Sequence, residues 1–325
     1  MLASDALGPT VCVGEIIVEI MATTPGDGFR QPQPLIGPFP SGAPLIFISQ
    51  CGRMGGQAAM IGAVGADDFG ALNLDRLRGD GVDTSAIAVD PELPTGSAFV
   101  RYRADGSRDF VFNIVHSAAG RFGWSDAVAA LVGRAGHLHV MGSALSMPSA
   151  CRVIERAAGL IKARGGSISV DPNLRKELAL GAAAEAVFAR LVGMADLLLP
   201  SGKELFRAAG MSPRAATEAE AVASLLERGV SEVVIKRGAD GASACDATGA
   251  VHAAAFAVEE IDPTGAGDCF GGAYLTCRRL GMGVEQALTY ACAAGARNVS
   301  IRGPAEGAGT RAELDAFIAA MGRAA

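Results

Sequence analysis

The sequence has no excess of positive charge and no long apolar run, and each absence excludes a class of partner. Lys and Arg number 28 against 34 Asp and Glu, which gives a formal net charge of -6. Because binding to a phosphate backbone needs clustered basic side chains, we expect no nucleic acid partner. No uncharged apolar stretch approaches the ~20 residues that span a bilayer, so we expect no membrane partner either.

Paired cysteines and a secretion signal are also missing. The seven cysteines are scattered, and no two of them form a Cys-x-x-Cys pair. This pattern indicates reduced, mostly buried thiols rather than a disulfide framework or a zinc site. Residues 1–5 lack the basic and apolar regions of a secretion signal. We therefore expect a cytoplasmic protein.

Two common nucleotide-binding motifs are absent as well. No G-x-G-x-x-G follows the first predicted strand, and no Walker A motif, G-x-x-x-x-G-K-[ST], occurs in the chain. The first absence argues against a dinucleotide-binding oxidoreductase and the second against a P-loop enzyme.

The segments that are present predict an α/β protein. With 325 residues, of which 50% are hydrophobic, the chain can build either one large α/β domain or a domain plus a smaller appendage. Strands are predicted at 10–20, 58–64, 137–142, 167–171, 197–200 and 232–236, and helices include 43–54, 72–78 and 269–279. This alternation is typical of βαβ units and a parallel sheet. Ligands bind beyond the carboxyl ends of such strands, where Asp171, Ser201 and Lys236 fall.

Two segments break the alternation. Residues 96–113 alternate apolar and polar side chains around a turn at 104–107, which predicts an antiparallel hairpin. Residues 23–44 contain six prolines, so an ordinary helix is excluded there. We interpret this second segment as a flap or an edge sheet.

The most informative segment is 261–270, Ile-Asp-Pro-Thr-Gly-Ala-Gly-Asp-Cys-Phe. Unpaired N–H groups at a helix start form an anion site, and Asp268 lies in the first turn of the helix that follows. A carboxylate beside an anion site suits a proton acceptor for an attacking hydroxyl, so this combination predicts phosphoryl transfer to an alcohol. A simple cap stays open as an alternative, with Asp268 complementing the helix dipole for about 0.3–1 kcal/mol.

Six segments, in this order, resemble the ribokinase-like (PfkB) carbohydrate kinases: Val13–Glu15, Ser41–Pro44, Gly62–Gly70, Asp171–Arg175, Val234–Gly241 and Asp262–Leu275. The resemblance covers nearly the whole chain. It implies a ribokinase-like three-layer αβα fold with a mostly parallel central sheet and a small β-sheet lid. The large domain would comprise 1–15, 41–95 and 118–325, and the lid 16–40 and 96–117.

The resemblance also implies an ATP-dependent sugar kinase that uses Mg²⁺. Asp268 would be the catalytic base, and the anion hole would consist of Gly265, Ala266 and Gly267. The nucleotide side would include Lys236, Gly238, Ser201, Glu204 and Asn298. The substrate side would include Glu19, Gly42, Asp171 and Arg175. Glu204 would hold Mg²⁺ through water, and a monovalent cation such as K⁺ would lie near Asp262 and Thr264.

Three departures from the family pattern affect the choice of substrate. Ile46 replaces an amide that commonly contacts the sugar, and Ser201 replaces the Asn of an Asn-x-x-Glu motif. Ile114 stands where ketodeoxygluconate kinases tend to have an Arg. A neutral ketohexose such as tagatose or fructose is therefore favoured. The alternatives are 2-keto-3-deoxygluconate as an acidic substrate, or a non-catalytic sugar- or nucleotide-binding regulator on the same fold.

Simpler explanations remain for several of these residues. Ser201 and Glu204 fit a helix capping box, Asp171 and Arg175 a structural ion pair, and Lys236–Gly238 a strand end with a turn glycine. His137 and His139 alternate on one strand, but no third ligand is visible, so we expect ordinary strand residues. The exposed edge of the lid is a natural surface for a homodimer.

Overall fold

The computed structural model describes residues 2–26, 28–103, 108–173 and 180–322. Within these ranges the strands form a large sheet of nine and a small sheet of four. The spatial order of the large sheet is β13 (Gly249–Ala253), β12 (Ala242–Asp246), β11 (Glu232–Lys236), β10 (Leu197–Leu198), β9 (Ser167–Asp171), β8 (His137–Met141), β1 (Thr10–Val13), β4 (Ala58–Gly65) and β5 (Val82–Asp90). The strands from β11 to β5 are parallel, whereas β12 and β13 add an antiparallel edge.

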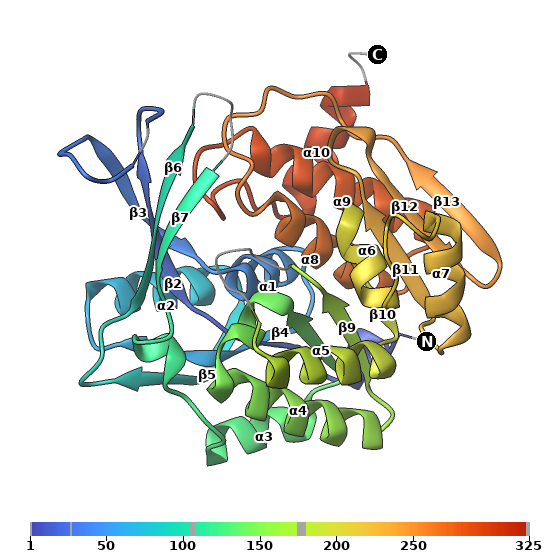
Figure 1. Ribbon diagram of the computed structural model, residues 1–325, viewed down its shortest axis with the longest axis horizontal. Coiled ribbons are helices and arrows are strands. Elements are labelled where there is room, and N and C mark those ends of the chain that lie inside the picture. Colours follow the sequence, from blue (N-terminus) through green and yellow to red (C-terminus); the bar gives the residue numbers. More distant parts are fainter. Residues whose placement is uncertain (1, 27, 104–107, 174–179, 323–325) are drawn as a thin grey trace.

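Helices cover both faces of the large sheet, as Figure 1 shows. One apolar core lies between the sheet and α3 (Asp126–Arg134), α4 (Pro148–Ala163), α5 (Ala182–Met194), α6 (Gly202–Ala209) and α7 (Glu218–Glu227). A second core lies between the other face and α1 (Ala43–Arg53), α2 (Asp68–Gly79), α8 (Ala266–Arg279), α9 (Val284–Val299) and α10 (Arg311–Gly322). Short 3₁₀ helices are found at Asp5–Leu7, Ala118–Gly120, Gly142–Ser146 and Gly238–Asp240. The predicted three-layer α/β architecture is confirmed.

The central strands are buried because helices cover both of their faces. Every residue of β4, β8 and β9 is buried, and polar residues among them, such as His137 and Ser169, hydrogen-bond to each other. None of the helices in the described ranges has the length and apolar character needed to cross a bilayer.

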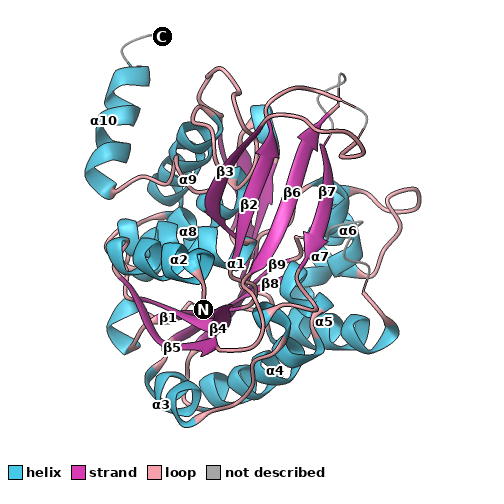
Figure 2. Ribbon diagram, turned by 90° about the vertical axis from the view of Figure 1, so that its left-hand side faces the viewer, coloured by secondary structure: helices cyan, strands magenta, loops and turns pink. Residues whose placement is uncertain are grey.

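The small sheet has the order β3 (Leu35–Ser41), β2 (Ile17–Ala22), β6 (Gly96–Tyr102) and β7 (Arg108–Asn113). It stands over the large sheet in Figure 2 as the lid. The predicted hairpin is confirmed by the antiparallel pairing of β6 and β7, while its turn at 104–107 lies outside the described residues. The proline-rich segment provides β3, an edge strand, where missing N–H donors are tolerated. The division of the chain into two domains stays a prediction.

The single strand predicted at 10–20 is wrong, because the structure has two strands there. β1 pairs with β4 and β8 in the large sheet, whereas β2 pairs with β3 and β6 in the lid. The chain changes sheet at residues 14–16, where Gly14 is so closely packed that a side chain would collide with Pro44. Apolar periodicity alone does not show such a change of partner.

Other boundaries also differ from the prediction. α8 begins at Ala266 rather than at Cys269. The edge strands β5 and β13, and β12 next to β13, were not predicted. These strands are partly exposed, so their side chains do not form the apolar runs that mark central strands.

His137 and His139 are ordinary buried residues of β8, as expected. Both ring nitrogens of His137 hydrogen-bond to serine hydroxyls of β9, Ser167 Oγ and Ser169 Oγ, at 2.7 Å each. His139 Nδ1 hydrogen-bonds to Ser169 Oγ at 2.7 Å, and its ring stacks on Phe47 with 3.5 Å between centroids. His139 Nε2 has no hydrogen-bond partner among the described residues.

Candidate active site

The anion loop, residues 262–268, leads into α8. Gly265 is the N-cap with φ 78°, and a side chain at this position would collide with the backbone oxygen of Pro304. The first helical hydrogen bond runs from Cys269 N to Gly265 O at 2.8 Å. The N–H groups of residues 266–268 therefore belong to the first turn, where a helix offers them no acceptor. An anion that approaches this turn meets donors and the positive end of the helix dipole.

Asn298 lies beneath the anion loop and is fully buried. Its Nδ2 donates to Thr264 O at 2.7 Å and to Pro304 O at 3.2 Å. Its Oδ1 has no hydrogen-bond partner in the described part of the chain. The structure thus places Asn298 below the loop, where it supports the backbone from inside the protein.

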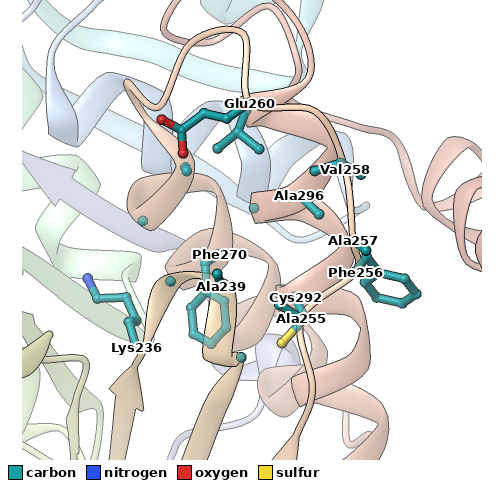
Figure 3. A pocket seen from close by; sticks show the side chains of 16 residues that line it. Lys236, Ala239, Ala255, Phe256, Ala257, Val258, Glu260, Phe270, Cys292 and Ala296 are labelled. Carbon is teal, nitrogen blue, oxygen red and sulfur yellow. The ribbon is translucent and has the colours of Figure 1, made fainter. Parts of the chain in front are cut away.

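A cavity of about 410 Å³ lies on one side of the first turn of α8. Lys236, Gly238 and Gly267 line one end of it. Apolar side chains line most of the rest: Ala255, Phe256, Ala257, Val258, Phe270, Cys292, Ala296 and Val299. The carboxylate of Glu260 also belongs to the lining (Figure 3). In Figure 3, Lys236 extends from one side, and the segment with Phe256 and Ala257 passes along the other. The cavity combines an apolar body with a cationic, amide-rich end, as an adenine nucleotide requires.

Lys236 links this cavity to a group of buried carboxylates. Its Nζ forms an ion pair with Asp171 Oδ2, and the two side chains are 14% and 0% exposed. A Cβ on Gly267 would be 3.5 Å from Nζ, so the ammonium group lies next to the anion loop. Burial raises the pKa of Asp171 to about 7, although Lys236 opposes this shift. Burial alone would lower the pKa of Lys236, but Asp171 and Glu204 outweigh it and the pKa is raised.

Ser201 and Glu204 lie at the start of α6, next to the end of β11. Ser201 N and Oγ donate to Glu204 Oε2 at 2.9 and 2.6 Å, which forms the capping box predicted as the simpler explanation. Ser201 also bridges to Lys236 as an isolated parallel pair. The predicted strand-end positions of Asp171, Ser201 and Lys236 are therefore confirmed, and the three residues lie together.

A second pocket lies on the other side of the α8 start, under the lid. Its polar lining consists of Glu15, Glu19, Ser41, Ser143, Thr264 and Asp268, and its apolar lining of Ile17, Ile46, Phe110, Phe112 and Ile114. Gly42 and Ala43 complete the wall. Ser143 Oγ donates to Glu15 Oε1 at 2.7 Å, and Ser41 Oγ donates to Glu19 Oε2 at 3.1 Å. Carboxylates and hydroxyls beside apolar walls are suited to the hydroxyls and carbon faces of a sugar.

The lid contacts the anion loop directly. Tyr102 Oη, on β6, donates to Asp262 Oδ1 at 2.7 Å. Arg108 Nη1, on β7, donates to Thr264 Oγ1 at 2.8 Å. Asp262 is 1% exposed and also accepts hydrogen bonds from Thr264 N and Gly303 N, each at 3.0 Å. The loop is therefore held from below by Asn298 and from above by two lid strands.

Most of the predicted site residues fall around these two cavities. Ala266, Gly267, Lys236 and Gly238 line the nucleotide cavity, and Asp268, Glu19 and Gly42 line the pocket under the lid. Gly265 lies beneath the loop surface, and Asp171 lies behind Lys236, outside the lining of either cavity. Arg175 is outside the described residues. The roles of these residues stay predictions.

Several polar residues near the site were not predicted as site residues, including Ser41 beside Glu19 and Arg108 next to Thr264. Glu15 and Ser143 line the pocket under the lid, Tyr102 reaches Asp262, and Asn173 reaches Asp268. Glu15, Ser143 and Asn173 each follow the carboxyl end of a central strand within two residues. That position is a usable signal, because ligands of parallel sheets bind at this edge. Tyr102 gives no such signal, since its role depends on how the lid sits on the loop.

No group of three or more His, Cys, Asp or Glu side chains within the described ranges is arranged to hold a metal ion by itself. A divalent ion at this site would therefore need ligands from a bound nucleotide and water, as Mg²⁺ commonly has. All seven cysteines are free thiols, and burial raises the pKa of Cys269. Cys269, next to Asp268, is accordingly a packed thiol, as expected.

A nucleotide-sized cavity and a carboxylate-lined pocket that meet at a helix N-terminus define a phosphotransferase acting on a hydroxyl group. Comparisons with known proteins agree with this class. The sequence profile of the pfkB family carbohydrate kinases matches residues 10–311. The chain belongs to this family, so the non-catalytic regulator is set aside.

Named relatives act on more than one sugar. The chain is 30% identical over 324 residues to a 2-dehydro-3-deoxygluconokinase of Thermoproteus tenax, covering 98% of this chain and 96% of that protein. It is 31% identical over 319 residues to fructokinase-1 of Oryza sativa subsp. japonica, covering 94% and 95%. An E. coli crystal structure, provisionally assigned as a ribokinase II and solved with ATP and Mg²⁺, has a TM-score of 0.88 and 42% identity, covering 96% and 99%. The ribokinase-like fold is thus confirmed, and the relatives differ in substrate.

Proposed function

We propose that this carbohydrate kinase transfers the γ-phosphate of ATP to a hydroxyl of a neutral ketohexose, with Asp268 as the proton acceptor. The observation that most supports this proposal is the meeting of two cavities at the start of α8. Ala266 and Gly267 border the nucleotide cavity, while the next residue, Asp268, borders the pocket under the lid. A phosphoryl group and a hydroxyl bound in these cavities would approach each other across a single helical turn.

Phosphoryl transfer depends mainly on the positioning of the reactants and on stabilisation of negative charge, with little covalent chemistry by the protein. Asp268 would accept the proton of the attacking hydroxyl as the new P–O bond forms. The N–H groups of residues 266–268 and the ammonium of Lys236 would stabilise the negative charge on the transferred group. The lid over the pocket would exclude water, which would otherwise take the place of the sugar as acceptor.

A neutral substrate is favoured by the lining of the pocket. No Lys or Arg is among the described residues that line it, and Glu15 and Glu19 are both 3% exposed. A carboxylate on the substrate would be repelled by these side chains. Ile114 lines the pocket at the position where a sugar-acid kinase would have a cation. An acidic 2-keto-3-deoxy sugar is the second candidate, supported by the relative from Thermoproteus tenax.

Mg²⁺ bound with ATP would neutralise phosphate charge and orient the transferred group. The carboxylate of Glu204 fits the water-mediated role proposed for it, since oxygen donors are the ligands that Mg²⁺ prefers. Oε2 already accepts two hydrogen bonds from Ser201. Glu204 would therefore contact the ion through water and not directly.

A monovalent cation near Asp262 stays a prediction, and comparing turnover in KCl and NaCl tests it. The carboxylate already accepts three hydrogen bonds, from Tyr102, Thr264 and Gly303. About four acceptor positions are available on a carboxylate, so backbone oxygens would have to supply most of the ligands. We derive no catalytic step from such an ion.

Pairing of two copies through the lid also stays a prediction, which light scattering tests. Leu35 on β3 and Val111 on β7 are 44% and 51% exposed, so the outer strands of the lid offer apolar side chains. We keep the cytoplasm as the proposed compartment because all seven cysteines are free thiols.

The decisive experiment measures ADP release with fructose, tagatose and 2-keto-3-deoxygluconate. We expect turnover with at least one ketohexose and a lower kcat/KM with the sugar acid. The Asp268→Asn variant should lose about 10²–10⁴-fold in kcat, the contribution typical of a general base. Asp126→Asn is the matched control, because Asp126 is an exposed aspartate in the first turn of α3. Near-normal activity of Asp268→Asn would remove the proposed base, and a preference for the sugar acid would reverse the substrate order.

A further inference from the structure

Asn173 has an unusual backbone conformation and an unusual partner. It lies two residues beyond the end of β9, with φ 30°, and is the one non-glycine residue with positive φ in the described ranges. Its Nδ2 donates to Asp268 Oδ1 at 2.9 Å. A residue that holds a sparsely populated conformation while contacting the proposed base invites a functional explanation.

The turn that contains Asn173 is anchored to the nucleotide side of the site. Asn173 N donates to Asp171 Oδ1 at 3.1 Å, and the other oxygen of Asp171 is paired with Lys236. One buried carboxylate therefore holds both the lysine of the nucleotide cavity and the turn that reaches Asp268. The array Lys236–Asp171–Asn173–Asp268 runs from one cavity to the other.

Position 173 needs a residue that accepts positive φ and that can donate a hydrogen bond to Asp268. Asparagine tolerates positive φ better than most residues with a side chain. It also has an NH₂ group to donate, which an aspartate at the same position would lack. Because an ionised carboxylate only accepts hydrogen bonds, the nitrogen and not the oxygen of the amide must face Asp268.

We propose that Asn173 is a positioning residue that fixes the carboxylate of Asp268 for proton transfer from the sugar. The proposal rests on the proposed function, in which Asp268 is the proton acceptor. The amide holds Oδ1 and so limits rotation of the carboxylate about its Cβ–Cγ bond. Donation to Oδ1 also stabilises the ionised form of the carboxylate and so keeps the base in its active state at lower pH.

Other charges act on the same carboxylate and must be held constant in a test. Among the described residues, the titratable and charged groups near Asp268 include Lys236 at the end of β11, Asp171 at the end of β9, Glu204 on α6, Glu15 between β1 and β2, Glu19 on β2, and the thiols of Cys12 and Cys269. Variants at position 173 leave all of these groups in place.

Two substitutions separate the amide from the backbone strain. Asn173→Gly removes the amide but accepts positive φ without strain, and it keeps the N–H that bonds to Asp171. We expect kcat to fall by about 10- to 100-fold, the effect of one lost hydrogen bond to a charged group. The acid limb of the kcat/KM profile for the sugar should move to higher pH by about one unit, while KM for ATP changes little.

Asn173→Asp keeps the shape of the side chain but places a second carboxylate against Asp268. Like charges disfavour ionisation, so the acid limb should move further than in Asn173→Gly. A merely structural role would lower thermal stability in both variants without this graded shift. An Asn173→Gly variant with normal kcat and a normal pH profile would overturn the proposal.

The Asp268→Asn variant distinguishes this inference from the proposed function. If Asp268→Asn is inactive and Asn173→Gly is normal, the positioning role alone is wrong. If Asp268→Asn keeps full activity, the proposed base is wrong and the positioning role fails with it. All profiles are measured with the sugar that gives the highest turnover, on variants whose melting temperatures show that they are folded.

Discussion

Lys236 and Asp171 form an ion pair that is almost closed to solvent, with side-chain exposures of 14% and 0%. Removing one partner of such a pair leaves an uncompensated buried charge. Replacing Lys236 by Met should destabilise the protein by about 3 kcal/mol at pH 8. The loss should be smaller at pH 6, because Asp171, whose pKa is raised by burial to about 7, then takes up a proton. Urea unfolding at the two pH values measures the difference.

The double variant Lys236→Met/Asp171→Asn is the control for this prediction. It removes both charges and keeps an acceptor for the backbone N–H of Asn173. Stability should return toward that of the unmodified protein, whereas KM for ATP should stay raised in both variants because the cation beside Gly267 is missing. Equal stability of the single variant and the unmodified protein would show that the pair matters little for folding.

The sequence predicted the position of single residues where the relevant neighbours are local. The place of Asp268 and of the glycines before it at a helix start followed from one short segment, since a helix start and its first turn are adjacent in the chain. The contacts of Asn298 with the loop and of Asn173 with Asp268 could not be predicted, because the partners lie 34 and 95 residues apart in the chain. Asn298 was predicted on the nucleotide side instead. Apolar periodicity and turn residues describe local structure, so they do not show which distant segments come into contact.

Among the larger elements, the two lid strands β6 and β7 hold the anion loop through Tyr102 and Arg108. The Tyr102→Phe variant removes only the hydroxyl that donates to Asp262. A net contribution of about 0.5–1.5 kcal/mol is typical of one hydrogen bond, so kcat/KM should fall by up to about tenfold. Steady-state kinetics with saturating ATP measures this change.

Tyr290→Phe provides a matched control. Tyr290, on α9, donates to Asp315 on α10, and neither residue lines the cavity beside Lys236 or the pocket under the lid. The Tyr290→Phe variant should lose about 0.5–1.5 kcal/mol of stability, as is typical of one hydrogen bond, without a change in kcat/KM. If the two variants have the same kinetics, the lid contact does not help to place the loop.

Elements were predictable where burial leaves a regular pattern in the sequence. The central parallel strands followed from apolar runs and the hairpin β6–β7 from alternation, whereas β5, which is also parallel, did not. The break between β1 and β2 did not, because both strands are buried and only Gly14 and Glu15 separate their apolar runs. Strands β12 and β13 were not predicted because half-exposed strands leave a weak apolar pattern in the sequence.

The whole molecule should lose stability in mild acid. His137 and His139 are buried, and burial lowers the pKa of each well below 6.5. Below about pH 6.5 the unfolded chain binds two protons that the folded protein excludes, so stability falls as pH falls. Asp171 acts in the opposite direction, because its raised pKa lets the folded protein bind one more proton than the unfolded chain between about pH 4 and 7. The net effect is about one proton, or ~1.4 kcal/mol per pH unit.

Urea midpoints between pH 7.5 and 5.0 check this expectation. Replacing His137 by Gln should reduce the pH dependence by about one proton. His252→Gln is the control, since His252 is exposed on β13 and should leave the slope unchanged. A slope that is unaffected by the His137 variant would contradict the assignment.

Because the chain passes from β1 in the large sheet into β2 in the lid, a sugar bound at the proposed site would contact both parts of the protein at once. Glu15 lies where the chain leaves the large sheet, Glu19 belongs to the lid, and Asp268 belongs to the large body. A sugar that contacts Glu19 and Asp268 together acts as a tether between the two bodies. A shorter polyol that reaches only Asp268 would dock without tethering the lid. The enzyme would then discriminate against it in kcat and not in KM, because such a ligand occupies the site without completing it.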